Sequence, residues 1–128
     1  MLITRESEYA IRMVRALADN EIKPVRKICD DEPVPLKWAY KILKKMEHAN
    51  IVKSFHGVKG GYRLDKEISE ITMLDIFAIN ENNLRTGRCL HGCAHDAKSK
   101  RCLMNKDFEQ VENTIKTALN KITIDKLV

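Results

Sequence analysis

Residues 35–64 combine a helix that separates apolar from basic side chains with a glycine-tipped hairpin directly after it. Pro35 suits the first position of a helix that runs to about Ala49. At about 100° per residue, its apolar and basic side chains fall on opposite sides. The apolar arc holds Ala39, Ile42, Leu43 and Met46, and the basic arc holds Lys37, Lys41, Lys44 and Lys45. One side of this helix is predicted to pack on a core, and the other to carry a row of ammonium groups.

A β-hairpin is predicted next along the chain. Residues 51–55 have the pattern of a strand, a second strand starts at Tyr62, and Gly57, Gly60 and Gly61 lie between them. Glycines supply the positive φ values that a tight hairpin tip requires. A glycine-rich loop can instead cradle phosphates, but such a loop opens into a helix, whereas this one opens into a strand. The hairpin interpretation is therefore favoured over a nucleotide-binding loop.

Two helical segments precede the basic helix. Thr4 suits the N-cap of an amphipathic helix over about residues 5–19. A short helix across residues 25–29 is closed by residues 30–35, whose two prolines cannot continue it. Three helices followed by a hairpin make a winged helix-turn-helix, in which the last helix enters the major groove of DNA and the wing reaches the backbone or minor groove.

The C-terminal half adds a helix that needs a partner. Thr72 is predicted to cap a short helix from Met73 to about Glu81, with Leu74, Phe77 and Ala78 on one face. Residues 83–102 follow neither the helical nor the strand period. Beyond them, apolar residues recur in steps of three and four, at Phe108, Val111, Ile115, Ala118 and Ile122. This spacing predicts an apolar seam along one side of a long helix, which needs a partner helix to cover it.

The expected fold is mainly α with a small β-hairpin, a winged helix-turn-helix plus a long C-terminal dimerisation helix. We expect three parts: a winged helix-turn-helix DNA-binding domain over 1–82, a loop over 83–104 whose cysteines are predicted to bind a metal cluster, and a dimerisation helix with a tail over 105–128.

The charge distribution agrees with a nucleic-acid partner. Lys and Arg outnumber Asp and Glu by 13 to 8 in residues 1–63 and equal them, 10 to 10, in residues 64–128. Residues 35–63 hold seven basic side chains against the single acid Glu47, a density that attracts polyanions. The plainer alternative is a small helical domain with a solvated basic face. The residues predicted to contact DNA are Lys37, Trp38, Lys41, Lys44, Lys45, His56 and Lys59, although Trp38 also suits half-buried packing.

Other classes of protein fit the sequence poorly. A chain of 128 residues with 44% hydrophobic residues is one domain with a real core. Charged residues at the start and the lack of an apolar run of roughly 18 residues predict a cytoplasmic protein that does not enter a membrane. No nucleophile–base pair or phosphate loop indicates an enzyme.

Three cysteines in one segment predict a metal site or a redox-active thiol centre. Cys89, Cys93 and Cys102 have the spacing C-x3-C-x8-C, with His91 and His95 between them. Zinc would take the three thiolates and one histidine, an iron–sulfur cluster also binds thiolates, and redox-active thiols are a third option. The spacing does not separate zinc from iron–sulfur. Cys29 is expected to be a small buried apolar residue.

Four stretches of the chain resemble the IscR/NsrR-type (Rrf2) bacterial transcriptional regulators. They are residues 9–12 (YAIR), 40–46 (YKILKKM), the wing at 52–54 and 60–64 (VKS and GGYRL), and 71–76 (ITMLDI). The resemblance covers about residues 1–120. It implies dimeric winged-helix DNA-binding proteins, many of which carry a [2Fe-2S] or [4Fe-4S] cluster on three loop cysteines and sense cluster status, nitric oxide or redox state.

The resemblance also implies the ligands of the cluster. The family cysteines fall on Cys89, Cys93 and Cys102, although their spacing here departs from that of well-known members. The fourth ligand falls on Glu8, from the first helix of the other subunit, or on His91 or His95; Glu8 is otherwise a solvated acid of a first helical turn.

The sequence and the resemblance together predict a homodimer that binds a pseudo-palindromic operator. Its affinity for the operator is expected to be set by the iron–sulfur cluster. The alternatives are the same fold with a zinc or thiol sensor, and a small iron–sulfur redox carrier whose lysines dock an acidic partner.

Overall fold

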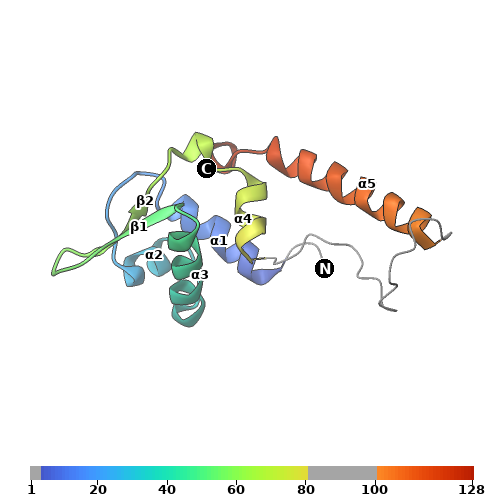
Figure 1. Cartoon of the computed structure of the whole chain (residues 1–128). Helices are drawn as coiled ribbons and strands as arrows, with labels where there is room; N and C mark the ends of the chain where they lie inside the picture. The colour runs from blue at the N-terminus through green and yellow to red at the C-terminus, as the bar shows by residue number, and fades with distance from the viewer. Residues whose placement is uncertain (1–3, 81–100) are drawn as a thin grey trace.

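The computed structural model describes residues 4–80 and 101–128. Their order is helix, helix, helix, hairpin, helix, helix, as expected from the sequence (Figure 1). The helices are α1 (Arg5–Ala16), α2 (Val25–Asp31), α3 (Leu36–His48), α4 (Met73–Asn80) and α5 (Arg101–Asn120). The strands are β1 (Val52–Phe55) and β2 (Gly61–Leu64), and two 3₁₀ turns are η1 (Ile68–Glu70) and η2 (Ile124–Leu127). The prediction of a mainly helical winged fold is confirmed.

The core lies between α1, α2 and α3. All four residues of the predicted apolar arc of α3 are fully buried, as are Ala10, Met13 and Val14 of α1. Thr4 caps α1 as predicted, because its side chain accepts a hydrogen bond from the backbone N–H of Ser7. α1 ends at Ala16, earlier than expected, and Asn20 in the following turn has a φ of 63°.

A Schellman turn directs the chain from α3 into the hairpin. Asn50 adopts a φ of 58°, which asparagine tolerates better than most residues. The backbone N–H of Asn50 donates to the carbonyl of Glu47 at 3.0 Å, and that of Ile51 donates to Met46 at 2.9 Å. The end of the basic helix and the start of the wing are therefore held at a fixed angle.

The wing has a third backbone partner that the sequence did not indicate. β1 and β2 pair antiparallel, from Val52 opposite Leu64 to Phe55 opposite Gly61. Lys23, in the connection between α1 and α2, exchanges two backbone hydrogen bonds of 2.9 and 2.8 Å with Tyr62. A Cβ atom on Gly61 would lie 2.2 Å from the carbonyl oxygen of Lys23. Gly61 therefore permits this close approach, in addition to any role at the hairpin tip.

The C-terminus returns to the core, which corrects one expectation. The N–H of Met73 donates to the carbonyl of Ile122 and that of Ile124 to Ile71, both at 2.8 Å, and Ile124 is fully buried (Figure 1). Ile122 therefore lies beyond the end of α5 and was wrongly assigned to its apolar seam. Of residues 121–128, Ile124 is buried in the core, whereas the others are partly or fully exposed.

Two further boundaries differ from the expectation. α5 begins at Arg101, four residues before position 105, so Cys102 lies in its first turn and not in a loop. In α4, Ile76 and Phe77 are buried whereas Ala78 is exposed, so the buried face of this helix is rotated from the predicted one. Thr72 caps α4 as predicted, accepting from the N–H of Asp75 while the Asp75 carboxylate accepts from the N–H of Thr72.

Candidate nucleic-acid interface

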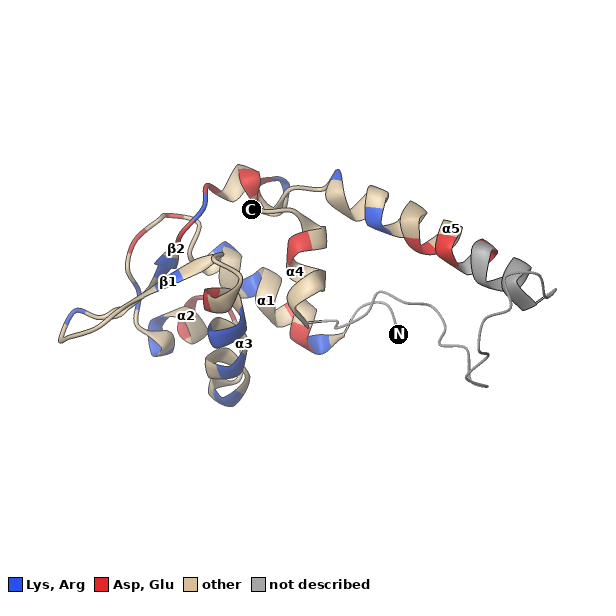
Figure 2. Ribbon diagram, in the orientation of Figure 1, with Lys and Arg blue, Asp and Glu red and all other residues tan. Residues whose placement is uncertain are grey.

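Lysines recur along α3, and the hairpin loop also carries a basic residue (Figure 2). Lys37, Lys41 and Lys44 are exposed, and Lys45 is partly buried. His56 and Lys59 are exposed on the loop between β1 and β2, where Val58 also extends fully into solvent. A helix with exposed ammonium groups, followed by a hairpin with basic residues in its loop, is an arrangement that suits contacts to a nucleic-acid backbone.

Trp38 packs on the core. Its side chain is half-buried, and its ring centroid lies 6.3 Å from that of Tyr9 in α1. The Nζ atom of Lys41 lies 5.1 Å from the centroid of the Trp38 ring, within the range of a cation–π contact. Trp38 therefore helps to orient Lys41.

Glu6 joins two of the predicted DNA-contact lysines. In the first turn of α1, its Oε1 atom lies 2.7 Å from Nζ of Lys41 and its Oε2 atom lies 2.9 Å from Nζ of Lys45. Hydrogen bonds from Lys41 and Lys45 hold the pKa of the Glu6 carboxyl below its ordinary value. No sequence pattern singled out Glu6, because the pairing depends on how α1 packs against α3. Within the described part of the chain, no ion pair involves Lys37 or Lys44.

The base of the wing adds two cations that the sequence analysis did not assign to the site. Nζ of Lys53 and Cζ of Arg63 lie 5.8 and 5.1 Å from the centroid of the Phe55 ring. Ser54 donates a hydrogen bond of 2.7 Å to Oε1 of Glu47, which ties β1 to α3. The directly paired positions of Lys53 and Arg63 on the two strands explain why both reach one ring.

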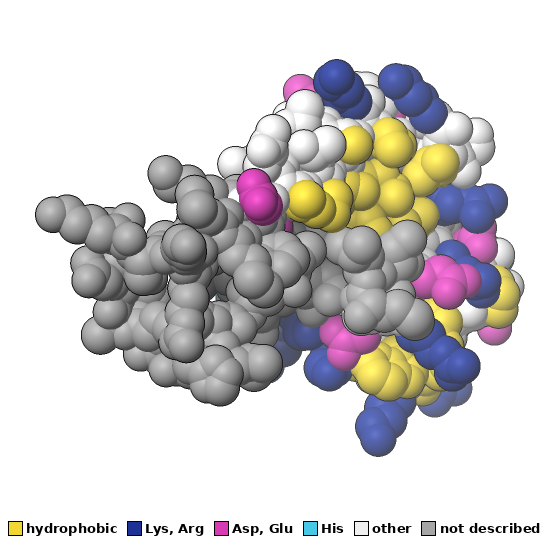
Figure 3. Space-filling view, turned by 90° about the vertical axis from the view of Figure 1, so that its right-hand side faces the viewer, with side chains coloured by type: hydrophobic (Ala, Val, Ile, Leu, Met, Phe, Trp, Pro, Cys, Tyr) yellow, Lys and Arg dark blue, Asp and Glu magenta, His cyan; other side chains and the backbone are white. Residues whose placement is uncertain are grey.

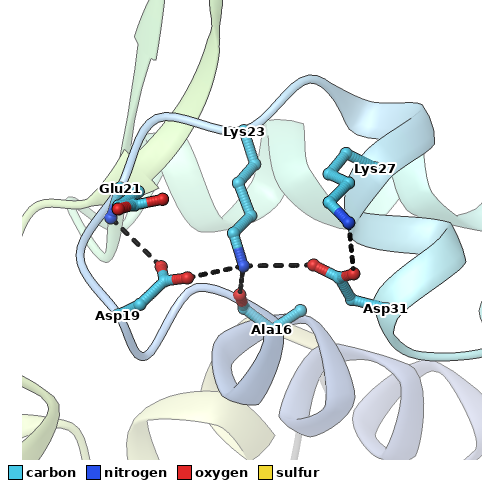
Figure 4. Close-up of polar contacts among 6 residues, drawn as sticks. All are labelled: Ala16, Asp19, Glu21, Lys23, Lys27 and Asp31. Atoms are coloured by element: carbon cyan, nitrogen blue, oxygen red, sulfur yellow. Dashed lines mark hydrogen bonds and ion pairs between the residues drawn. The ribbon is translucent and has the colours of Figure 1, made fainter.

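Lys23 fixes the wing to the helices with its side chain as well as its backbone (Figure 4). Its Nζ atom donates to the carbonyl of Ala16 at 2.7 Å and lies 2.8 Å from Asp19 and 3.1 Å from Asp31. Hydrogen bonding to Asp19 raises the pKa of Lys23, and hydrogen bonds from lysines lower those of both aspartates, with Lys27 the main cause at Asp31. A lone lysine in a loop gives no such signal in the sequence.

Most residues of the predicted cluster site lie outside the described residues: Cys89, His91, Cys93 and His95. For Cys102 the structure gives only its place in the first turn of α5. No group of three potential metal ligands occurs among the side chains that the structure describes. Cys29 is partly buried against the core, and burial raises the pKa of its thiol, as expected of a packing residue.

Glu8 is exposed at the surface of α1. Its side chain is 52% exposed and its Oε1 atom lies 2.6 Å from Nη2 of Arg12, one helical turn away. It lines an open hollow of about 430 Å³ together with Arg5, Tyr9, Arg12, Cys29 and residues 33–35. The carboxylate is therefore accessible to a group approaching from outside this chain.

Comparison with known proteins decides the family. A family model described as "Rrf2: Iron-dependent Transcriptional regulator" matches residues 3–128. The chain belongs to the Rrf2 family. Among similar curated proteins, it is 28% identical over 131 residues to the transcriptional regulator IscR of Vibrio atlanticus, covering 100% of this chain and 75% of that protein. It is also 28% identical to protein aau3 of Rhizobium meliloti, with 100% and 85% covered.

Solved structures share the fold of this Rrf2 protein. CymR, the global cysteine regulator of B. subtilis, superposes with a TM-score of 0.75 at 19% identity, covering 99% of this chain and 95% of that one. IscR of T. potens gives a TM-score of 0.74 at 20% identity, with 99% and 85% covered. The family and its curated relatives make the chain a DNA-binding transcriptional regulator and not an enzyme. No helix in the described ranges is long and apolar enough to cross a membrane.

Proposed function

We propose that the chain acts as a cytoplasmic homodimer that binds a pseudo-palindromic operator through α3 and the wing, with an affinity set by an iron–sulfur cluster. The lysine row on the exposed side of α3, together with the basic residues of the hairpin loop, carries this proposal. Its DNA contacts are Lys37, Lys41, Lys44 and Lys45 on the helix, Trp38 at its edge, and His56 and Lys59 on the wing. In a winged helix, such a helix lies in the major groove while the wing follows the adjacent backbone.

Lys37 and Lys44 give the most direct test of the DNA-binding face. We expect Lys37→Ala/Lys44→Ala to bind an operator selected from random duplexes at least about tenfold more weakly than the wild type, because interactions with phosphate dominate affinity. The slope of log K against log salt should become less steep by about 0.9 for each phosphate that the variant no longer neutralises. Lys66→Ala/Lys126→Ala removes the same charge from exposed residues outside α3 and the hairpin, and serves as the control. Equal affinity of both double variants for the operator would show that α3 is not part of the DNA-binding interface.

The second subunit is proposed to dock on α5. Val111 is 48% exposed and Ala118 is exposed, although both belong to the predicted apolar seam. Figure 3 views the side toward which α5 projects, and hydrophobic side chains gather there on the described surface. Apolar side chains left in water by a single chain favour self-association, and two subunits would hold two α3 helices at a fixed spacing.

The cluster is proposed to bind Cys89, Cys93 and Cys102, with Glu8 of the partner subunit as fourth ligand and His91 or His95 as the alternative. Exposure of the Glu8 carboxylate beside an open hollow fits this role, because a ligand for another subunit's cluster must face outward. A bound cluster would supply a redox-sensitive centre. α1 also carries Glu6, which contacts Lys41 and Lys45 of α3. Ligation through Glu8 of α1 would therefore link the cluster to the helix that is proposed to contact DNA bases.

The visible spectrum of anaerobically purified protein tests the cluster. We expect a brown protein whose absorption changes in Glu8→Ala, while its fold and subunit composition stay intact. A colourless protein that contains zinc would contradict the iron–sulfur proposal and favour a zinc site. An unchanged spectrum in Glu8→Ala, with absorption lost in His91→Ala or His95→Ala, would move the fourth ligand to a histidine.

A thiol sensor is the second candidate, because the fold matches structures of CymR, one of which is the oxidized form of the Staphylococcus aureus protein. Reversible oxidation of the cysteines would then replace cluster chemistry. A colourless, metal-free protein whose DNA affinity changes on treatment with peroxide and recovers with dithiothreitol would favour this sensor over the cluster.

A further inference from the structure

A single carboxylate of α1, that of Glu6, forms ion pairs with two lysines of α3. The two oxygens of Glu6 contact different partners, Lys41 at 2.7 Å and Lys45 at 2.9 Å. The Glu6 side chain is 17% exposed, whereas Lys41 and Lys45 are 54% and 34% exposed. The carboxylate is thus held beneath the lysines, which remain accessible from outside.

This arrangement divides the lysine row into two pairs. Lys37 and Lys44 are exposed and have no carboxylate partner among the described residues, so their charges are available to phosphate. Lys41 and Lys45 must give up a short ion pair with Glu6 before they can pair fully with a phosphate. When they do, the Glu6 carboxylate stays beneath the DNA backbone and repels it.

We propose that Glu6 is a specificity-determining residue of the DNA-binding face, which restrains sequence-independent binding by competing with DNA phosphates for Lys41 and Lys45. The inference rests on the proposed placement of α3 on DNA. Binding to arbitrary sequences depends almost wholly on interactions with phosphate, so a competitor for two lysines weakens it directly. At an operator, base contacts by the seated helix compensate for the competition.

Glu6→Gln tests the proposal because it removes the charge and keeps the shape. With the full chain, purified anaerobically, binding to a fluorescent duplex of random sequence is measured across salt concentrations. Freeing two lysines should steepen the slope of log K against log salt by up to about 1.8, two phosphates at about 0.9 each. That slope corresponds to an additional loss of about tenfold between 50 and 200 mM salt, and affinity at 50 mM should rise correspondingly. The gain at a selected operator should be smaller.

Glu47→Gln is the matched control. Glu47 lies on α3 itself and accepts a hydrogen bond from Ser54, and no ion pair joins it to a lysine among the described residues. The substitution makes the same change in net charge and leaves Lys41 and Lys45 paired with Glu6. Its binding to the random duplex should therefore keep the wild-type salt slope.

A second comparison isolates the lysines. Lys41→Ala/Lys45→Ala should weaken random-duplex binding much more in the Glu6→Gln background than in the wild type. Equal effects in the two backgrounds, or a Glu6→Gln slope equal to that of Glu47→Gln, would overturn the role of Glu6. These outcomes differ from failure of the proposed DNA-binding face itself. If α3 did not contact DNA, Lys37→Ala/Lys44→Ala would leave operator binding unchanged.

Discussion

Single residues in this protein owe their roles to neighbours that are distant in the sequence. The apolar arc of α3 could be predicted because burial repeats with the helical period, and all four of its members are buried. The partners of Glu6 and Lys23 could not be predicted, because they depend on the packing of α1 against α3 and on the crossing of residues 16–24 beside the wing. Local patterns identify the exposed lysines but not which of them are already paired.

Gly61 offers a test of one such contact. A methyl group at this position would lie 2.2 Å from the carbonyl oxygen of Lys23, so either the wing or the Lys23 segment must move. We expect Gly61→Ala to lower the free energy of unfolding by about 1–3 kcal/mol, the usual cost of overpacking. Urea unfolding followed by circular dichroism measures it.

Val58→Ala provides the comparison for Gly61→Ala within the same hairpin. Val58 is fully exposed, so its replacement should leave the unfolding free energy within about 0.5 kcal/mol of the wild type. If Gly61→Ala proved as harmless as Val58→Ala, the close approach of Lys23 to β2 would not constrain the fold.

At the scale of the element, the connection between α1 and α2 acts as a brace for the wing. Lys23 joins β2 through its backbone and the end of α1 and α2 through its side chain (Figure 4). The helices and hairpin were predictable from periodicity and glycines, whereas this brace was not, since its partners come from three elements. The same limit explains the return of the C-terminus, where Ile124 fills the core beside Ile71.

The brace predicts a pH-dependent contribution to stability. The pKa values of Asp19 and Asp31 are lowered by lysine hydrogen bonds, so their contribution is complete above the pKa of unfolded aspartate, about 3.9, and is lost as the pH falls. Lys23→Met should therefore destabilise the protein most near pH 7. The difference from the wild type in urea unfolding should narrow as the pH falls toward 3.

Two features sharpen the test of the brace. The hydrogen bond from Lys23 to the Ala16 carbonyl does not titrate in acid, so the difference should narrow without vanishing. Lys27→Met removes only a partner of Asp31 from a more exposed position and should cost less at every pH. A Lys23→Met deficit that stays constant from pH 7 to 3 would mean that the two aspartates do not contribute to the brace.

At the scale of the whole molecule, α5 has two ends with different surroundings. Its C-terminal end leads into residues 122–124, which bond to residues 71–73 and anchor the helix to the core. Its outer part extends away from the other helices (Figure 1). The sequence predicted that this helix needs a partner helix, and the exposure of Val111 agrees with that prediction. Ile124, by contrast, is buried in the chain's own core.

This difference predicts that self-association and folding can be separated by mutation. Val111→Asp places a charge on the exposed seam of α5, where it touches little in a single chain but would be buried between two subunits. We expect the variant to sediment as a monomer, to retain the wild-type circular dichroism spectrum, and to lose binding to a two-half-site operator by about 100-fold. Asn113→Asp, an exposed position on the opposite side of α5 at 100° per residue, should remain dimeric.

Ile124→Ala should show the reverse behaviour. Removing a fully buried side chain from the core should lower the unfolding free energy by about 2–5 kcal/mol, while the remaining folded protein still associates through α5. Sedimentation velocity and urea unfolding on the same samples separate the two effects.

A dimeric Val111→Asp variant would place the subunit interface elsewhere than on the exposed seam of α5. The spacing between the two α3 helices of a dimer would then have to be set by a different surface, because the hydrogen bonds of the Schellman turn and of Lys23 connect α3 and the wing only within each chain.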